Sequence, residues 1–154
     1  MRIKNLKECV EVLPVIAQWH HDEWRDYNPG QTLDRRIQNM RRHLQADPVP
    51  STFVAIDRKV VGSAAIVEHD MDVHQELTPW LASVYVEVSS RGQGTGSSLV
   101  RYVMQHAKAA GITSLYLFTP DRQKFYQRLG WEVLSREDYL GHKVTVMSVL
   151  LKDA

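Results

Sequence analysis

The spacing of apolar residues changes near residue 50. Before that point, two segments carry apolar side chains at helical spacing, residues 6–24 and the residues that follow Thr32, which is a good N-cap. Pro14 complicates the first half of the first segment, because proline is tolerated only in the first turn of a helix. Residues 1–4 predict an edge strand. The first third of the chain is therefore predicted to be mainly helical.

From residue 52 onward, short β-branched and alternating runs predict strands. The expected strands are residues 52–56, 60–67, 82–88, 114–118 and 143–150, with a further one near Leu134. The first two are joined by a tight turn and predict an antiparallel hairpin. The strand at 114–118 follows a helix and should lie parallel to the strand at 82–88. The pattern predicts an α/β fold, a mixed sheet with helices on both faces.

A glycine-rich turn joins the strand at 82–88 to the helix that follows. It consists of Arg91, Gly92, Gln93, Gly94, Thr95 and Gly96. Glycines let the backbone approach a ligand and adopt positive φ. The first amides of a helix lack intrahelical acceptors, and the helix dipole favours negative charge there. Taken alone, the turn fits a pyrophosphate site and a plain left-handed turn equally well.

The spacing of the glycines separates the known phosphate loops. A dinucleotide loop, G-x-G-x-x-G, would need glycine at Ser97, and no Walker lysine follows the glycines. The sequence Arg91-x-x-Gly94-x-Gly96 instead resembles the [RQ]-x-x-G-x-[GA] acyl-CoA loop of the GCN5-related N-acetyltransferase (GNAT) superfamily.

A second motif supports that resemblance. A predicted buried strand, residues 115–118, is followed by Phe125-Tyr126 and then by Gly130-Trp131. Strand followed by F-Y-x-x-x-G-[FW] is similar to the last conserved block of the superfamily. The resemblance spans residues 50–150 in element order. It implies a mixed, mostly antiparallel central sheet with one parallel strand pair at the cofactor site, and acetyl-CoA as the co-substrate.

The resemblance also implies which residues contact the cofactor. The glycine-rich turn and Ser97 would hold the pyrophosphate, and the backbone of Val86, Glu87 and Val88 would pair with the pantetheine arm. Phe125 would pack under the cofactor. Thr119 stands near the position where the superfamily often has an asparagine that contacts the cofactor, and the resemblance implies a cofactor contact for it.

Tyr126 is the expected proton donor to the departing thiolate, a role that the resemblance implies. A phenol with a pKa of about 10 is protonated at neutral pH and can donate to a thiolate whose pKa is about 8.5. The alternative is a tyrosine that packs on the sheet with its hydroxyl at the surface.

An attacking amine must lose a proton, so a carboxylate or histidine is expected nearby. Glu68 is the preferred acceptor, ahead of its neighbours His69 and Asp70 and of Glu87 on the central strand. The residues expected to shape the acceptor site are His20, Glu23, Trp24 and Trp80. Solvated charges and ordinary core packing are the alternatives.

Composition limits the class of protein. A chain of 154 residues is expected to form a single acyltransferase domain. In it, residues 1–50 would form a helical acceptor-side segment, and residues 51–110 would form the sheet core with the acetyl-CoA loop and helix. Residues 111–154 would form the C-terminal strands and helix.

The net charge of +1 does not favour nucleic acid as a partner, and Arg36 is read as part of a solvated basic helix face. No apolar run is long enough for a membrane span, the N-terminus shows no signal-peptide pattern, and there is a single cysteine, Cys9. We therefore expect a cytoplasmic protein.

The function expected from the resemblance is transfer of an acetyl group from acetyl-CoA to a primary amine, by direct attack in a ternary complex. The amine would belong to a small molecule or a peptide. We expect no metal, because the acidic and histidine residues at 68–74 lack the spacing of a zinc site. A non-catalytic acyl-CoA-binding or sensor module is the alternative. A homodimer, the acyl-chain length and the identity of the amine stay open.

Overall fold

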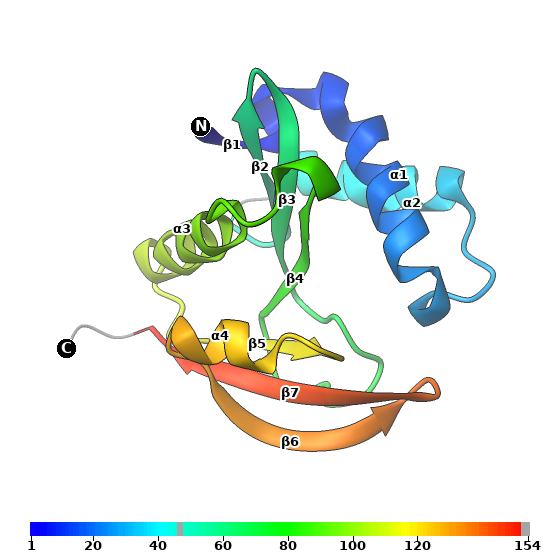
Figure 1. Ribbon diagram of the computed structural model, residues 1–154. Helices are drawn as coiled ribbons and strands as arrows, with labels where there is room; N and C mark the ends of the chain where they lie inside the picture. Colours follow the sequence, from blue (N-terminus) through cyan, green and yellow to red (C-terminus); the bar gives the residue numbers. More distant parts are fainter. Residues whose placement is uncertain (46–47, 152–154) are drawn as a thin grey trace.

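A computed structural model describes residues 1–45 and 48–151. Within these residues the chain forms a seven-stranded mixed sheet in the order β1-β2-β3-β4-β5-β7-β6 (Figure 1). The strands are β1 (Arg2–Asn5), β2 (Ser51–Asp57), β3 (Lys59–Val67), β4 (Trp80–Val86), β5 (Ser114–Thr119), β6 (Glu132–Tyr139) and β7 (His142–Leu150). Neighbouring strands are antiparallel except β4 and β5, which are parallel. The predicted mixed sheet with one parallel pair is confirmed.

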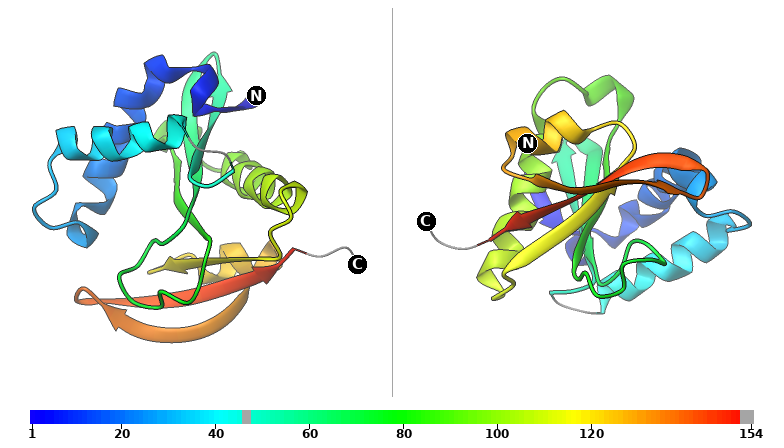
Figure 2. Two further views of the ribbon diagram at one scale, coloured as in Figure 1. Left: turned by 180° about the vertical axis from the view of Figure 1, so that it is seen from behind. Right: turned by 90° about the horizontal axis from the view of Figure 1, so that it is seen from below.

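Helices cover both faces of the sheet, as predicted (Figures 1 and 2). They are α1 (Leu13–Trp24), α2 (Leu33–Arg41), α3 (Thr95–Ala109) and α4 (Gln123–Arg128). Side chains alternate across a strand, and β2 shows the result. Val54 packs with α1 and α2, whereas Phe53 and Ala55 pack with α3. Two core clusters therefore lie on opposite sides of one sheet.

The parallel pair is joined at one end only. Within the described residues, Trp80 and Tyr116 are the one register pair between β4 and β5, supported by a hydrogen bond from the Tyr116 N–H to the Pro79 carbonyl at 3.1 Å. Beyond this pair the strands diverge, and Figure 1 shows the β1–β4 half of the sheet turning away from the β5–β7 half. The splayed strand edge that the resemblance implies is present.

Two boundaries differ from the prediction. The α-helix of the first segment begins at Leu13, not near residue 6, and residues 6–8 and 10–12 form separate 3₁₀ turns. Pro14 explains the start, because it lies in the first turn, where its missing N–H costs nothing. The central strand ends at Val86, and Val88–Ser90 forms a 3₁₀ turn instead of continuing the strand.

Thr32 is the N-cap of α2, as predicted. Its hydroxyl accepts a hydrogen bond from the Arg35 N–H at 3.1 Å. The apolar side chains of α2 then face α1 and the sheet, with Met40 fully buried. This packing places α1 and α2 beside β3 and β4, and the last turn of α1 reaches the gap between β4 and β5.

Candidate functional site

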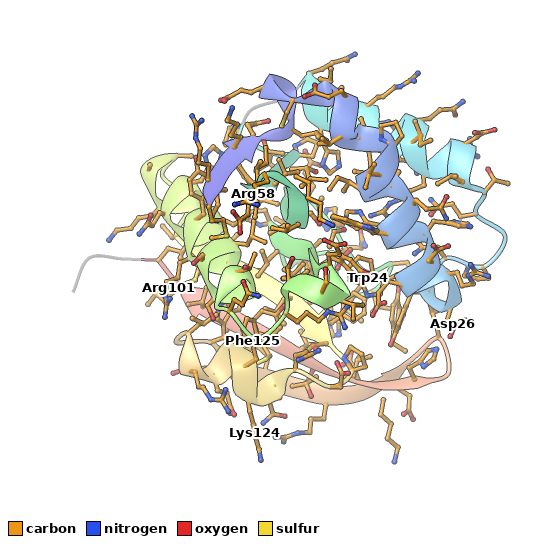
Figure 3. All side chains as sticks on the ribbon, turned by 45° about the horizontal axis from the view of Figure 1, so that its top comes forward. Trp24, Asp26, Arg58, Arg101, Lys124 and Phe125 are labelled. Carbon is orange, nitrogen blue, oxygen red and sulfur yellow. The ribbon has the colours of Figure 1, made fainter. Side chains whose placement is uncertain are left out.

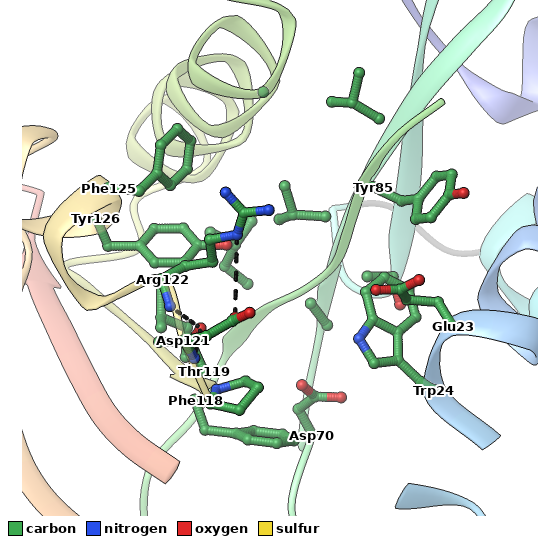
Figure 4. A pocket seen from close by; sticks show the side chains of 18 of the residues that line it. Glu23, Trp24, Asp70, Tyr85, Phe118, Thr119, Asp121, Arg122, Phe125 and Tyr126 are labelled. Atoms are coloured by element: carbon green, nitrogen blue, oxygen red, sulfur yellow. Dashed lines mark hydrogen bonds and ion pairs between the residues drawn. The ribbon is translucent and has the colours of Figure 1, made fainter. Parts of the chain in front are cut away.

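A cleft of about 590 Å³ occupies the space where β4 leaves β5. This volume suits a small molecule or the arm of a cofactor. One wall is the end of α1 with the open edge of β4, and the other is the end of β5 with α4 (Figure 4). The glycine-rich turn before α3 closes one end. Every residue of β4 from Leu81 to Val86 lines the cleft.

The turn before α3 has the backbone geometry of an anion site. Gly92 and Gly94 adopt φ values of 79° and 84°, which other residues rarely adopt, and Gly94 is the N-cap of α3. No side chain caps the helix, so the amides of its first turn have no intrahelical acceptor and lie beside the cleft. The cleft in front of those amides favours the pyrophosphate site over a plain left-handed turn.

The Arg91 side chain hydrogen-bonds the glycine-rich turn to the end of β4. Its Nε donates to the Val86 carbonyl at 2.8 Å, and its guanidinium lies 5.4 Å from the centre of the Tyr85 ring. The side chain lines the cleft beside Ser90 and Gly92. A positive charge is therefore held next to the unpaired amides, where it would add to the attraction for phosphate.

Phe125, on α4, faces the glycine-rich turn. Figure 3 shows it turned toward the interior of the molecule, whereas its neighbour Lys124 points outward. A methyl group built on Gly96 would lie 3.5 Å from the Phe125 ring and 3.7 Å from Val86. Thr119 ends β5 at the cleft, and its hydroxyl accepts a hydrogen bond from the Arg122 N–H at 3.0 Å. Thr119 therefore also orders the chain that leads into α4.

Tyr126 points from α4 into the cleft (Figure 4). Its ring is buried between Phe125 and Trp131, at centroid distances of 4.9 and 6.0 Å. Burial raises the pKa of its phenol well above the ordinary value, because the phenolate would be poorly hydrated there. Tyr126 is therefore a neutral hydrogen-bond donor at every physiological pH.

The part of the cleft away from the glycine-rich turn carries aromatic rings and carboxylates. Glu23 and Trp24 of α1 lie on the wall opposite Tyr126, next to Tyr85 (Figure 4). Asp70, in the loop after β3, is open to water inside the cleft but surrounded by its walls. This partial loss of hydration raises the pKa of Asp70 to about 7, and the positive charge of Arg36 opposes the rise. Asp70 therefore changes its charge near neutral pH.

Among the described residues, three that were predicted for catalysis or acceptor binding do not line the cleft: Glu68, Trp80 and His20. Glu68 is exposed, and its carbonyl accepts a hydrogen bond from the Thr78 hydroxyl at 2.7 Å. Trp80, the first residue of β4, is fully buried in a cluster with Met71 and Val146, and its Nε1 donates to the Leu77 carbonyl at 2.6 Å. His20 is buried behind the cleft, 2.8 Å from the Ser63 hydroxyl.

Three residues predicted to contact the cofactor also lie outside that lining. Glu87 forms an ion pair with Lys59 at 3.1 Å, and Val88 and Gln93 are exposed in the turn. The change from strand to 3₁₀ turn after Val86 explains the first two, because it rotates them away from the strand edge. The remaining residues of the predicted cofactor site line the cleft: Val86, Arg91, Gly92, Gly94, Thr95, Gly96, Ser97, Thr119 and Phe125.

Sequence reasoning missed Arg36. It was expected on a solvated helix face, but its side chain is partly buried, lines the cleft and contacts His20 and Ser83. The helical spacing could have predicted the burial of Arg36. Arg36 lies three residues after Leu33 and four before Met40, which places it on the apolar face of α2.

A family model matches most of this chain. The model of the Acetyltransferase (GNAT) family matches residues 13–131, which is more than half of the chain. The chain belongs to this family. The match includes the glycine-rich turn, both strands of the parallel pair and α4.

Solved structures of GNAT acetyltransferases share the fold over nearly the whole chain. An aminoglycoside 6'-N-acetyltransferase complexed with coenzyme A superposes with a TM-score of 0.78 at 16% identity, over 100% of this chain and 99% of that one. A putative acetyltransferase from Salmonella typhimurium with its cofactor acetyl-CoA gives 0.74 at 17% identity, over 100% and 95%. A ribosomal-protein-alanine N-acetyltransferase from Brucella melitensis gives 0.78 at 18% identity, over 98% and 100%.

A curated relative matches over a shorter stretch. An indole-3-glycerol phosphate synthase from Thermococcus kodakarensis is 29% identical over 86 residues, which are 56% of this chain and 36% of that protein. The chain thus spans about a third of that relative's length, and the match does not extend to its activity.

Membership of the GNAT family supports acetyl transfer from acetyl-CoA as the general activity. Across the described residues, every helix is too short or too polar to span a bilayer.

Proposed function

We propose that this chain is an acetyl-CoA-dependent N-acetyltransferase whose acceptor is a primary amine. The observation that carries the proposal is the cleft itself. The cleft brings together the uncapped N-terminus of α3 at Gly94, the open edge of β4 and the buried phenol of Tyr126. A cofactor with phosphates at one end and a reactive thioester at the other fits that order.

The pyrophosphate of acetyl-CoA would lie against the first amides of α3, with the Arg91 guanidinium beside it. The pantetheine arm would follow β4 between the glycine turn and the middle of the strand, where its amides could hydrogen-bond to the unpaired edge. Phe125 would pack against this arm. The thioester would then reach the centre of the cleft, between β4 and Tyr126.

The reaction is direct attack by a neutral amine. The amine nitrogen bonds to the thioester carbon, and a tetrahedral intermediate forms whose oxyanion would be stabilised by a backbone N–H of β4. Collapse of the intermediate breaks the carbon–sulfur bond and gives the amide and the thiolate of CoA. The amine loses one proton and the thiolate gains one, so the products are an N-acetyl amine and CoA-SH.

Asp70 is our choice for the group that takes the proton from the amine, in place of Glu68. Asp70 lines the cleft and Glu68 does not. A carboxylate with a pKa of about 7 is half ionised at neutral pH and is a stronger base than an ordinary aspartate.

Tyr126 is the proposed donor to the departing sulfur. Its raised pKa makes it a weak acid, so complete proton transfer to a thiolate with a pKa of about 8.5 is uphill. A hydrogen bond from the phenol still stabilises the negative charge that develops on sulfur, and it does so at any pH at which the enzyme is folded. The proton then returns from water.

The acceptor end of the cleft suits an amine with further positive charge. Among the described residues, the carboxylates of Glu23 and Asp70 accept no hydrogen bond and form no close ion pair, and Arg36 acts on Asp70 only from a distance. Trp24 and Tyr27 offer aromatic faces in the same cleft. Carboxylates and aromatic rings both attract ammonium groups. Aminoglycosides are the substrates named for one structural neighbour, and a protein's alanine for another. An aminoglycoside-like polyamine fits the carboxylates of Glu23 and Asp70 better than a protein's amino terminus does, because it carries several positive charges.

The test begins with thermal unfolding in acetyl-CoA, CoA, ATP and NAD at equal millimolar concentration. We expect acetyl-CoA and CoA alone to raise the midpoint, because a ligand that binds only the folded state stabilises it. A panel of amines with thiol detection follows. Stabilisation by CoA without thiol release from any amine would favour the sensor alternative, and absence of stabilisation would overturn the cofactor site.

A further inference from the structure

Ser83, in the middle of β4, has a left-handed backbone. Its φ is +55°, an uncommon value for a residue other than glycine. The register explains why it occurs there. Ala82 pairs with Ala65 and Tyr85 pairs with Ser63, so two residues of β4 face one residue of β3 and form a bulge. A strained residue of this kind persists only when its surroundings hold it in place.

A chain of hydrogen bonds holds the Ser83 carbonyl. The Nη2 of Arg36 lies 2.7 Å from Nδ1 of His20, and because a guanidinium can only donate, Nδ1 is the acceptor. The His20 Nε2 therefore carries the hydrogen and donates to the Ser63 hydroxyl at 2.8 Å. The Ser63 hydroxyl donates in turn to the Ser83 carbonyl at 3.0 Å.

The same arginine also holds the Ser83 side chain. The second hydrogen of the Arg36 Nη2 is donated to the Ser83 hydroxyl at 3.1 Å. His20 and Ser63 are almost completely buried. Burial lowers the pKa of His20 well below its ordinary value, with Arg36 and His43 acting in the same direction, so the ring stays neutral and keeps its tautomer. The bulge is thus fixed by groups from α1, α2 and β3.

The bulge lies where the proposed reaction would take place. The residues of β4 around it, Ala82 and Val84, line the cleft on the edge that β5 leaves open. We propose that Arg36 and His20 are positioning residues, which hold the Ser83 bulge and thereby set the direction of the β4 peptide groups that face the thioester. This inference rests on the proposed acetyl transfer. Neither residue needs to touch the reacting atoms.

The first test separates turnover from binding. Arg36→Met should lower kcat by about 30-fold, because a small displacement of the groups around a reacting centre has effects of this size. The affinity for CoA should change by less than about 3-fold, since the pyrophosphate is held at the glycine turn, away from this network. Arg35→Met is the matched control, an exposed arginine one position earlier on α2. Equal loss of affinity and turnover in Arg36→Met would overturn the proposal.

The second test uses the strain itself. Ser83→Ala and Ser83→Gly both remove the hydroxyl, but only glycine adopts positive φ without cost. Adding Arg36→Met should therefore reduce kcat strongly in the alanine background and by only about 3-fold in the glycine background. The same cost in both backgrounds would show that Arg36 does not act through the bulge. If Arg36→Met does not fold, Arg36→Lys replaces it, since it keeps the charge and the apolar stem.

The third measurement does not depend on activity. The ¹³Cα and ¹³Cβ chemical shifts of Ser83 report its φ, and they should move from left-handed toward extended values in Arg36→Met but not in Arg35→Met. Unchanged shifts would overturn the proposal. If the wild-type chain transfers acetyl groups to no amine, the proposed function fails, and the shifts of Ser83 still decide whether Arg36 holds the bulge.

Discussion

The proposed phosphate end of the cleft is made of backbone from one continuous stretch, whereas the proposed acceptor end is made of side chains from separate segments. At the phosphate end, Gly92 to Ser97 supply amides and left-handed turns within six residues. At the other end, Glu23, Asp70 and Phe118 come from α1, the loop after β3 and β5. A site made of local backbone leaves a readable motif, and a site assembled from distant side chains leaves none.

The phosphate end can be tested most severely at Gly94. Gly94→Glu should weaken CoA binding by about 100-fold or more, equivalent to about 2.8 kcal/mol, because the side chain fills the space before α3 and its charge repels the pyrophosphate. Calorimetry measures the affinity. Gly141→Glu is the matched control, since Gly141 also has positive φ, 81°, but lies in the turn between β6 and β7. Native affinity in Gly94→Glu would show that CoA binds elsewhere.

Tyr126 lies in the centre of the cleft, between its two ends, where the proposed reaction takes place. Tyr126→Phe should lower kcat by about 100-fold while leaving the affinity for acetyl-CoA nearly unchanged, because the hydroxyl acts on the thiolate that forms only during reaction. Steady-state kinetics with thiol detection, together with calorimetry, separate the two quantities. Tyr102→Phe, on the partly exposed side of α3, serves as the control. A wild-type rate across the pH range would remove Tyr126 from the mechanism.

The acceptor end can be tested by comparing two carboxylates that are two residues apart. Asp70→Asn should lower kcat/KM for the amine by about 10-fold or more, and Glu68→Gln should leave it within about 2-fold. In the wild type, kcat/KM should rise with pH and level off above about 7, because Asp70 accepts a proton only when it is ionised and its pKa is about 7. This rise should disappear in Asp70→Asn. The opposite ranking would restore Glu68 as the base.

The smallest effect is expected at Gly96. Its φ is not positive, and a methyl group there would make ordinary contacts, 3.5 Å from Phe125. Gly96→Ala should therefore change CoA affinity by about 3-fold or less, whereas Gly94→Ala should also lower the thermal midpoint, because left-handed backbone disfavours alanine. Equal effects at the two positions would mean that small size, rather than backbone conformation, is what the turn requires.

The sequence alone predicted the mixed sheet, the parallel pair and the helices on both faces. These features follow from local signals, such as the tight turn at Arg58, the N-cap at Thr32 and the helical spacing after Gly94. It also predicted most of the residues that line the phosphate end of the cleft. Its errors in the fold lie at element ends: the helix begins at Leu13, just before Pro14, and the strand stops at Val86, where a 3₁₀ turn follows.

Only the tertiary structure decided the acceptor end. Nothing in the spacing of Glu68 and Asp70 shows which carboxylate faces the cleft, since both belong to an irregular segment. Arg36, His20 and Ser83 are far apart in the sequence, and each has an ordinary local pattern. They meet because the helical period of α2, the alternation of β3 and the bulge in β4 direct them to one buried point. Local chemistry determined where phosphate would bind, and long-range packing determined what surrounds the reacting atoms.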